Sequence, residues 1–184
     1  MTPDVRCFTS ASFAYLDRAR VLAESVLRYH PRWQFHLLLC DENPPGFEWD
    51  ADNDIFASVL RASDLDIPEY RRWAFGHNVV EFCTAVKGFM LERLLSRGGS
   101  VIYLDPDTQV FTPLTEVEQL LEQHSVVLTP HVTLPETTPD GISDNEIGSL
   151  KHGIYNLGFI AVRACADGMA FARWWRDRLH QFCW

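Results

Sequence analysis

The sequence lacks the patterns of several common protein classes. Its 184 residues carry a net charge of −9, which argues against the basic surface that nucleic acids and anionic membranes attract. No apolar run is long enough to span a bilayer, and the N-terminus has no basic-then-apolar signal pattern. There is no G-x-G-x-x-G fingerprint and no P-loop, which disfavours a Rossmann dehydrogenase. We therefore expect no nucleic-acid partner and no transmembrane segment.

Cysteine is present, but its spacing does not suggest disulfides or zinc. The five cysteines are far apart in the sequence, and no C-x-x-C occurs: Cys7, Cys40, Cys83, Cys165 and Cys183. The first three lie within apolar segments, so we interpret them as small buried hydrophobic residues in a reducing compartment. No N-x-S/T sequon is present either. Together these observations predict a cytoplasmic protein.

The remaining sequence alternates between strand and helix patterns. Apolar residues make up 47% of the chain, enough for one domain with a sizeable core. The opening strand–helix–strand order has a short crossover, which indicates a parallel sheet. We predict strands at 5–9, 35–40, 55–60, 101–104, 125–128 and 154–163, and helices at 15–29, 78–94, 115–123 and 169–184. The predicted fold class is α/β, a single domain over 1–184 with a mostly parallel central sheet and helices on both faces.

Local signals predict some boundaries of these elements. Asn78 with Glu81, and Thr115 with Glu118, have the spacing of a capping box at a helix start. Residues 129–151 contain three prolines and two glycines, and they predict a long functional or mobile loop. The last helix reaches the final residue without a glycine, proline or polar tail. We therefore expect the chain to be a fragment of a longer polypeptide.

The segment Val101–Phe111, VIYLDPDTQVF, is the most informative one in the chain. Its apolar run predicts a strand buried on both faces, and Asp105 and Asp107 follow where that strand ends. Ligands bind at the carboxyl ends of strands in open α/β sheets. Two carboxylates placed there can hold a divalent cation, which suits chemistry on a phosphate ester or diphosphate. The alternative is that Pro106 merely shapes a turn and the two acids end the strand.

Three further Asp-x-Asp pairs show that the motif alone is weak support. They are Asp50/Asp52, Asp52/Asp54 and Asp64/Asp66. The first two follow a Pro-Pro-Gly stretch and predict a solvated acidic loop, and the third precedes Pro68 and predicts a turn or a helix start. Only the pair at 105 and 107 directly follows an apolar strand.

Five segments in order resemble a known enzyme family. They are FTSASFAYLDRA, EFCTAVKGFMLERLL, VIYLDPDTQVF, LTPH and YNLGFIAVR. Together they resemble nucleotide-sugar-dependent glycosyltransferases of the GT-A fold, similar in layout to glycosyltransferase family 8. The resemblance covers nearly the whole chain and implies a Rossmann-like GT-A domain. It implies transfer of a sugar from a nucleoside-diphosphate-sugar donor to a glycan, lipid-linked saccharide or protein acceptor. Such enzymes normally continue past this point, so a C-terminal portion with acceptor-side residues is expected to be missing.

The resemblance also implies roles for individual residues. Asp105 and Asp107 would hold Mn²⁺ or Mg²⁺ against the donor diphosphate, and Lys87 would face the phosphates or the sugar; these three form the expected catalytic set. The expected donor-binding residues are Ser10, Ser12, Tyr15, Asp41, Thr84, Lys87, His131 and Asn156. Within that set, the loop Ser10–Tyr15 would receive the base with Tyr15 or Phe13 as a stacking surface. Asp41 would contact the base or ribose, and His131 and Asn156 would lie near the sugar.

Each assignment has a structural alternative. Lys87 could extend along the flank of its helix, Tyr15 could be a core residue, His131 an ordinary surface residue, and Asn156 part of a turn. Two other functions also remain open. A haloacid-dehalogenase-like phosphatase uses an Asp-x-Asp pair after a strand, although Gln109 stands where its pattern has Thr or Val. A fragment that binds nucleotide or sugar without turnover is the third possibility.

Overall fold

The computed structural model describes residues 4–50 and 54–183, and its centre is a six-stranded sheet. The strands are β1 (Val5–Ala11), β2 (Gln34–Leu39), β3 (Ser58–Arg61), β4 (Ser100–Leu104), β5 (Val126–Pro130) and β6 (Tyr155–Arg163). Their order across the sheet is β3-β2-β1-β4-β6-β5. The first four in this order run parallel, whereas β6 is antiparallel to both of its neighbours. The predicted α/β class with a mostly parallel sheet is confirmed.

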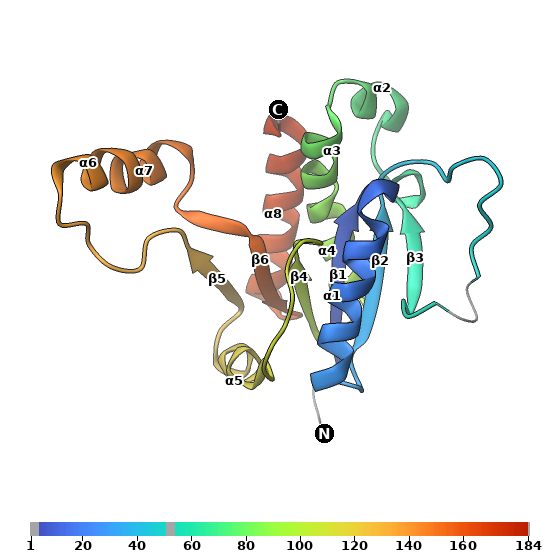
Figure 1. Cartoon of the computed structure of the whole chain (residues 1–184), viewed down its shortest axis with the longest axis horizontal. Coiled ribbons are helices and arrows are strands. Elements are labelled where there is room, and N and C mark those ends of the chain that lie inside the picture. Colours follow the sequence, from blue (N-terminus) through green and yellow to red (C-terminus); the bar gives the residue numbers. More distant parts are fainter. Residues whose placement is uncertain (1–3, 51–53, 184) are drawn as a thin grey trace.

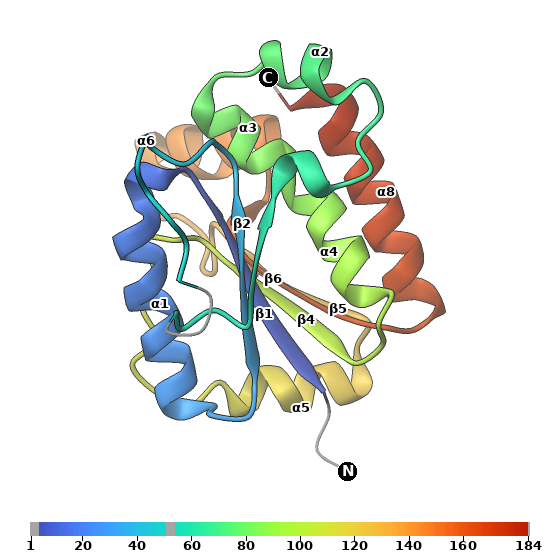
Figure 2. The same cartoon turned by 90° about the vertical axis from the view of Figure 1, so that its right-hand side faces the viewer.

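Helices cover both faces of this sheet. They are α1 (Leu16–Tyr29), α2 (Tyr70–Phe75), α3 (Val79–Ala85), α4 (Lys87–Leu95), α5 (Thr115–Gln123), α6 (Pro139–Gly141), α7 (Gly148–His152) and α8 (Ala166–Phe182). Figure 2 shows α1 on one side of the strands and α4 with α8 on the other. Short 3-10 turns occupy Phe13–Tyr15 and Ala62–Asp64, and a π-helical turn occupies Ile142–Ile147.

The side chains of β4 alternate between two hydrophobic cores. Ile102 and Leu104 pack in the core that includes α1 and Leu121 of α5. Val101 and Tyr103 pack in the core that includes α3, α4 and α8. All five residues of β4 are buried, so the prediction of a strand covered on both faces is confirmed. Because both faces of β4 are covered, Asp105 and Asp107 come only after the strand has ended, since burying an unpaired carboxylate is costly.

The helix predicted at 78–94 forms as two helices instead of one. The Asn78–Glu81 capping box is present at its start, but α3 ends at Ala85 and α4 begins at Lys87. Val79, expected on the core face, is 57% exposed. α4 then packs closely on α8, where a Cβ on Gly88 would lie 2.5 Å from Cα of Arg176. The break at Val86 thus separates two helices that both contact α8.

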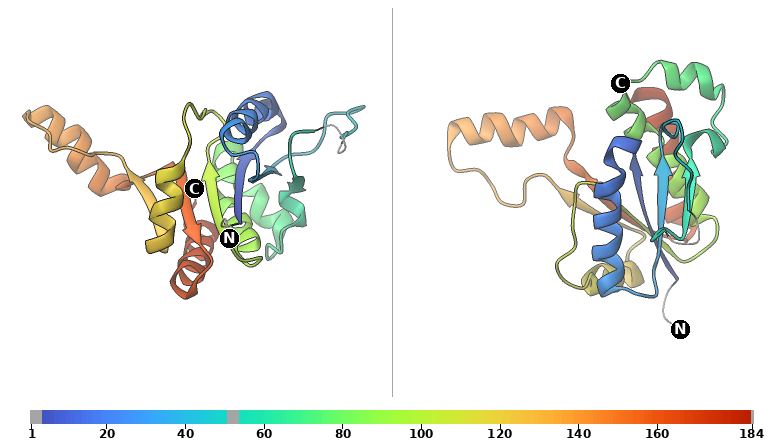
Figure 3. Two further views of the ribbon diagram at one scale, coloured as in Figure 1. Left: turned by 90° about the horizontal axis from the view of Figure 1, so that it is seen from below. Right: turned by 45° about the vertical axis from the view of Figure 1, so that its right-hand side comes forward.

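The loop predicted at 129–151 is present at 131–138, but β5 extends to Pro130 and residues 139–151 are helical, so the prediction was wrong for these parts. Thr138 accepts a hydrogen bond from the backbone of Gly141, and Pro139 occupies the first helical turn, where its missing N–H costs nothing. The segment 131–154, which we call the arm, links β5 to β6 and projects from the body of the molecule (Figures 1 and 3). Glu136 and Asn145 hydrogen-bond across the arm at 2.6 Å.

Other differences are smaller. The cap predicted at Thr115 was wrong, because Leu114 is the N-cap and Thr115 is already helical. The helix α2 was not predicted, and the third strand begins at Ser58 rather than at 55. Asp52 of the acidic loop lies outside the described residues, while Asp54 forms an ion pair with Arg20 at 2.9 Å. Across 4–50 and 54–183, no helix combines the length and the apolar character needed to cross a membrane.

Candidate functional site

A cavity of about 250 Å³ opens at the carboxyl ends of β1 and β4, beside α3. We call it the cleft. Its lining residues are Ser10, Ala11, Ser12, Tyr15, Val79, Val80, Cys83, Thr84, Lys87, Tyr103, Asp105, Pro106 and Asp107. Seven residues that the sequence predicted as site residues are among them: Ser10, Ser12, Tyr15, Thr84, Lys87, Asp105 and Asp107. The structure therefore brings most of the predicted set together from three separate segments.

A tight turn presents the two carboxylates. The backbone N–H and the hydroxyl of Thr108 donate hydrogen bonds to the carbonyl of Asp105 at 3.1 and 2.7 Å. Pro106 stands at the second position of this turn, where its fixed φ is favourable. The turn interpretation of these residues is thus correct, and the same turn places Asp105 and Asp107 on the cleft wall.

Lys87 forms a buried ion pair with Asp105. Its Nζ lies 2.9 Å from Oδ1 of Asp105 and 4.3 Å from the ring centre of Tyr103. The Lys87 side chain is 6% exposed and that of Asp105 is 35% exposed. The alternative that Lys87 extends along the helix flank is wrong, because its charge points inward to the cleft.

Tyr103, buried in β4, supports this ion pair through its hydroxyl. Its hydroxyl donates a hydrogen bond to Oδ1 of Asp105 and lies 3.4 Å from the hydroxyl of Ser10. Burial, followed by the charge of Asp105, raises the pKa of Tyr103 well above its usual value, so the phenol keeps its proton and remains a donor. Ser10 in turn donates to the carbonyl of Cys83 at 2.7 Å. These contacts fix Asp105 between β1, β4 and α4.

The antiparallel direction of β6 brings a further segment beside Asp105. The N–H of Asp105 donates to the carbonyl of Gly158 at 2.9 Å, and Oδ1 of Asn156 accepts from the N–H of Gly158 at 2.7 Å. A Cβ on Gly158 would lie 2.8 Å from Oδ1 of Asn156 and 3.1 Å from Oδ2 of Asp105. Asn156 is therefore close to Asp105, although it does not line the cleft, and it makes the local turn contact that was the alternative.

The chemistry of these donors fits a hard divalent cation in part. Oδ1 of Asp105 accepts bonds from Lys87 and Tyr103, while Oδ2 faces Gly158. Asp107 is exposed and adds a second carboxylate on the same wall. Within the described ranges, no group of three or more His, Cys, Asp and Glu side chains could hold a metal on its own. The chain thus offers two oxygen-bearing side chains, and the remaining ligands of Mn²⁺ or Mg²⁺ would have to come from a bound anion or water.

Asp41 and Phe13, both named from the sequence, do not line the cleft. Asp41 accepts a hydrogen bond from the N–H of Phe13 at 2.7 Å and so holds the turn that carries Tyr15. Phe13 packs edge-on against Phe47 at 4.7 Å, so of the two candidate stacking rings it is Tyr15 that lines the cleft. Tyr15 is 40% exposed, so the alternative that it belongs to the core is wrong.

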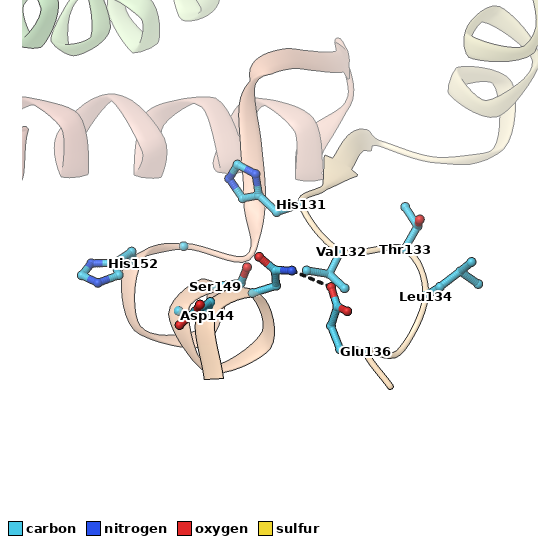
Figure 4. Close-up of a pocket in the computed structure, with 11 residues that line it drawn as sticks. His131, Val132, Thr133, Leu134, Glu136, Asp144, Ser149 and His152 are labelled. Carbon is cyan, nitrogen blue, oxygen red and sulfur yellow. Dashed lines mark hydrogen bonds between the residues drawn. The ribbon is translucent and has the colours of Figure 1, made fainter. Parts of the chain in front are cut away.

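His131 lies two strands away, in a separate cavity within the arm. The lining residues drawn in Figure 4 include His131 and Glu136 from the segment after β5, and Asp144, Ser149 and His152 from the helical part of the arm. Because β6 stands between β5 and β4, the end of β5 does not reach the cleft. His131 is exposed, in keeping with the surface alternative.

Sequence reasoning missed four residues of the cleft: Tyr103, Cys83, Val79 and Val80. Tyr103 gave a usable signal, because a tyrosine in an aliphatic buried strand needs a partner for its hydroxyl, and Asp105 two residues later lies on the same side. Val79 was expected to be a core residue, yet it is 57% exposed on the cleft wall. Val80, which the sequence analysis did not single out, is 72% exposed there.

Comparison with known proteins identifies the fold. No family model matches the chain, and no curated protein matches it. Among solved structures, it is similar to the glycosyltransferase GlyE of Streptococcus pneumoniae TIGR4, with a TM-score of 0.53, 16% identity, and coverage of 94% of this chain and 37% of that one. It is also similar to the bifunctional glycosyltransferase WbbM, with a TM-score of 0.54, 14% identity, and coverage of 97% of this chain and 34% of that one.

The galactosyltransferase LgtC, solved with donor and acceptor sugar analogues, gives a TM-score of 0.52 with 16% identity over 95% of this chain and 64% of that one. The chain thus spans about a third of GlyE and WbbM and less than two thirds of LgtC. At these identities the likeness establishes the fold. The mixed sheet with the cleft at its carboxyl edge is the GT-A fold of glycosyltransferases, as the resemblance in sequence implied.

Proposed function

We propose that the cleft binds a nucleoside-diphosphate sugar together with Mn²⁺ or Mg²⁺, and that the complete protein transfers the sugar to an acceptor. The observation that carries this proposal is the meeting of Asp105, Asp107 and Lys87 in one cavity at the end of β4. Two carboxylates beside a buried lysine suit a ligand that combines an anion with a cation. The GT-A fold supports sugar transfer in the same site.

The charges of the cleft favour joint binding of cation and diphosphate. Asp105, Asp107 and Lys87 carry one net negative charge between them, so the chain alone holds a divalent cation weakly and a bare diphosphate weakly. A cation held by Asp105 and Asp107 would act as a Lewis acid that stabilises the leaving diphosphate. Lys87, buried and held by Asp105, adds a fixed positive charge in a site of low water content, where such charges act more strongly.

The cleft also offers contacts for the rest of the donor. We assign the base to the exposed ring of Tyr15, since aromatic side chains stack on bases and the ring lies at the cleft edge. Ser12 and Thr84 provide hydroxyl groups for the ribose or phosphates. We assign Asn156 to the sugar, which is supported by its position near Asp105 across Gly158. Asp41 acts indirectly, by holding the turn before Tyr15.

The proposal also covers the family layout, the transferred sugar and the cellular compartment. We assign the layout of glycosyltransferase family 8 on the segments that resemble it, with a hexose as the transferred sugar. A contact of His131 with the donor sugar would need the arm to reach the cleft. The five cysteines form no disulfide, which supports a reducing compartment such as the cytoplasm.

A thermal-shift screen with UDP, GDP and dTDP, each with and without Mn²⁺, tests the proposal. A ligand of the folded state raises the apparent stability by mass action, by about 2.7 kcal/mol at a hundred times its Kd. We expect a shift for one base that depends on the cation and disappears in Asp107→Asn. The matched control is Asp66→Asn, which changes an exposed aspartate of another Asp-x-Asp pair outside the cleft and should leave the shift intact.

Transfer is then assayed by release of nucleoside diphosphate from the corresponding sugar donor. Release or transfer that requires both the cation and Asp107 supports catalysis. Binding without release favours the alternative of a non-catalytic binding fragment. If no nucleotide shifts the melting temperature under any condition, the proposal is wrong.

A further inference from the structure

Two cysteines from distant parts of the chain meet at the back of the cleft. Cys83 belongs to α3, is half-buried, and lines the cleft together with Thr84 and Lys87. Cys40 follows β2 and is 8% exposed. Cys83 packs against the hydrophobic core that contains Cys40, and each thiol is near enough to shift the pKa of the other. One thiol of the pair is thus open to the cleft and the other is shielded behind it.

The backbone around both cysteines is fixed by β1. The N–H of Cys40 donates to the carbonyl of Ala11 at 2.9 Å, and the hydroxyl of Ser10 donates to the carbonyl of Cys83 at 2.7 Å. Consecutive residues of one strand, Ser10 and Ala11, therefore anchor the backbone of both cysteines. This arrangement comes from the fold and does not rest on a flexible loop.

The two thiols differ in reactivity. The neighbouring Cys40 thiol, helped by the charge of Lys87, lowers the pKa of Cys83, although burial acts in the opposite direction. The Cys83 thiol and burial raise the pKa of Cys40 well above its usual value. The thiolate is the reactive form, so Cys83 is the attacking cysteine and Cys40 is the resolving cysteine. Cys7, by contrast, is fully buried with a raised pKa and is expected to be inert.

We propose that Cys83 and Cys40 form a peroxide-sensitive dithiol that closes to a disulfide in the cleft wall. The Cys83 thiolate attacks one oxygen of hydrogen peroxide, the O–O bond breaks, and sulfenic acid and hydroxide are formed. The Cys40 sulfur then attacks the sulfenic sulfur and displaces its hydroxyl group, which leaves as water with the thiol proton. Two thiols are oxidised by two electrons, and one peroxide is reduced to two waters.

The disulfide changes the shape of the cleft. Its formation requires the sulfur atoms to approach to about 2 Å, which draws α3 toward the end of β2. Thr84 follows Cys83 in α3 and Lys87 begins α4 directly after it, so a displacement of α3 is transmitted to both residues of the cleft wall. This consequence rests on the proposed function: the oxidised chain should bind its nucleoside diphosphate on the order of tenfold more weakly, because small displacements of positioned groups are costly.

A non-reducing tryptic map after treatment with stoichiometric hydrogen peroxide tests the dithiol directly. We expect peptides 33–61 and 73–87 to appear joined, with loss of two hydrogen atoms from the intact mass, and to separate after reduction. In Cys40→Ser, dimedone should trap a sulfenic acid on peptide 73–87. In Cys83→Ser, peptide 33–61 should remain unmodified. Cys165→Ser is the matched control and should form the same joined pair.

The proposal is overturned if Cys165 or Cys183 is oxidised while this pair stays reduced. It is also overturned if the joined peptides form at least as fast in the urea-unfolded chain, since the fold would then contribute nothing. Affinity for UDP, GDP or dTDP is measured on both redox forms. A disulfide with unchanged affinity refutes the effect on the cleft, whereas a reduced protein that binds no nucleotide refutes the proposed function and leaves the disulfide standing.

Discussion

Replacing Lys87 with methionine and Asp105 with asparagine should destabilise the fold by unequal amounts. At 2.9 Å, with an effective dielectric constant of about 20, the two charges attract each other by about 6 kcal/mol before desolvation is subtracted. What remains after each substitution depends on burial. The Lys87 side chain is 6% exposed, whereas that of Asp105 is 35% exposed and can regain water. The unpaired Lys87 that Asp105→Asn leaves behind therefore costs more free energy than the unpaired Asp105 that Lys87→Met leaves behind.

We expect Asp105→Asn to cost about 3 kcal/mol, the lower end for breaking a buried pair, since the ring of Tyr103 retains some attraction for the ammonium. Lys87→Met keeps the aliphatic volume and should cost about 1 kcal/mol. Urea unfolding followed by tryptophan fluorescence should separate the two midpoints by about 1 M. The double variant should cost less than the sum of the two. Equal costs, or a larger cost for Lys87→Met, would refute this account of the ion pair.

Three further predictions test other features. Gly158→Ala should weaken cation-dependent nucleotide binding at least about tenfold, measured by calorimetry, because its Cβ would press on Oδ2 of Asp105. Gly88→Ala should lower the free energy of unfolding by about 2 kcal/mol, since its Cβ would meet the backbone of α8, while Gly148→Ala, with open space around it, should not. Burial lowers the pKa of His36 to about 4, so stability present above pH about 6.5 should fall by about 3 kcal/mol as the pH drops toward 4.

Each of these has a clear contrary result. Unchanged binding in Gly158→Ala would mean that Asp105 is not held against β6 in the bound state. A Gly88→Ala variant as stable as Gly148→Ala would contradict the close contact of α4 with α8. A His36→Gln variant that keeps the full loss of stability between pH 6.5 and 4 would assign that loss to other groups.

The sequence was sufficient to predict the centre of the sheet and most of the cleft. A strand buried on both faces has to be apolar throughout, so β4 and the carboxylates behind it were visible as a pattern. The rule that ligands bind at the carboxyl ends of strands pointed to Asp105 and Asp107, and the resemblance to GT-A glycosyltransferases implied the residues after β1 that meet them. The Asn78 cap was equally local, because it depends on two side chains three residues apart.

Other features depend on contacts that a local pattern does not contain. The apolar run of β6 is the same for either direction, so its antiparallel course, which brings Gly158 to Asp105, was not predicted. Prolines and glycines suggested a loop at 129–151, yet Pro139 stands at a helix start where proline is tolerated. The separation of α3 from α4 follows from packing on α8, and the pairing of Cys40 with Cys83 follows from two strands and a helix that are distant in sequence.

Titration of Mn²⁺ followed by electron paramagnetic resonance tests the central claim most directly, because free and bound ions give different signals. We predict weak binding of Mn²⁺ by the chain alone, and binding at least about tenfold tighter when the nucleoside diphosphate selected by the thermal-shift screen is present in excess. Asp107→Asn should abolish this gain, whereas Asp66→Asn should keep it. A gain that survives in Asp107→Asn, or no gain with any nucleoside diphosphate, would contradict the account.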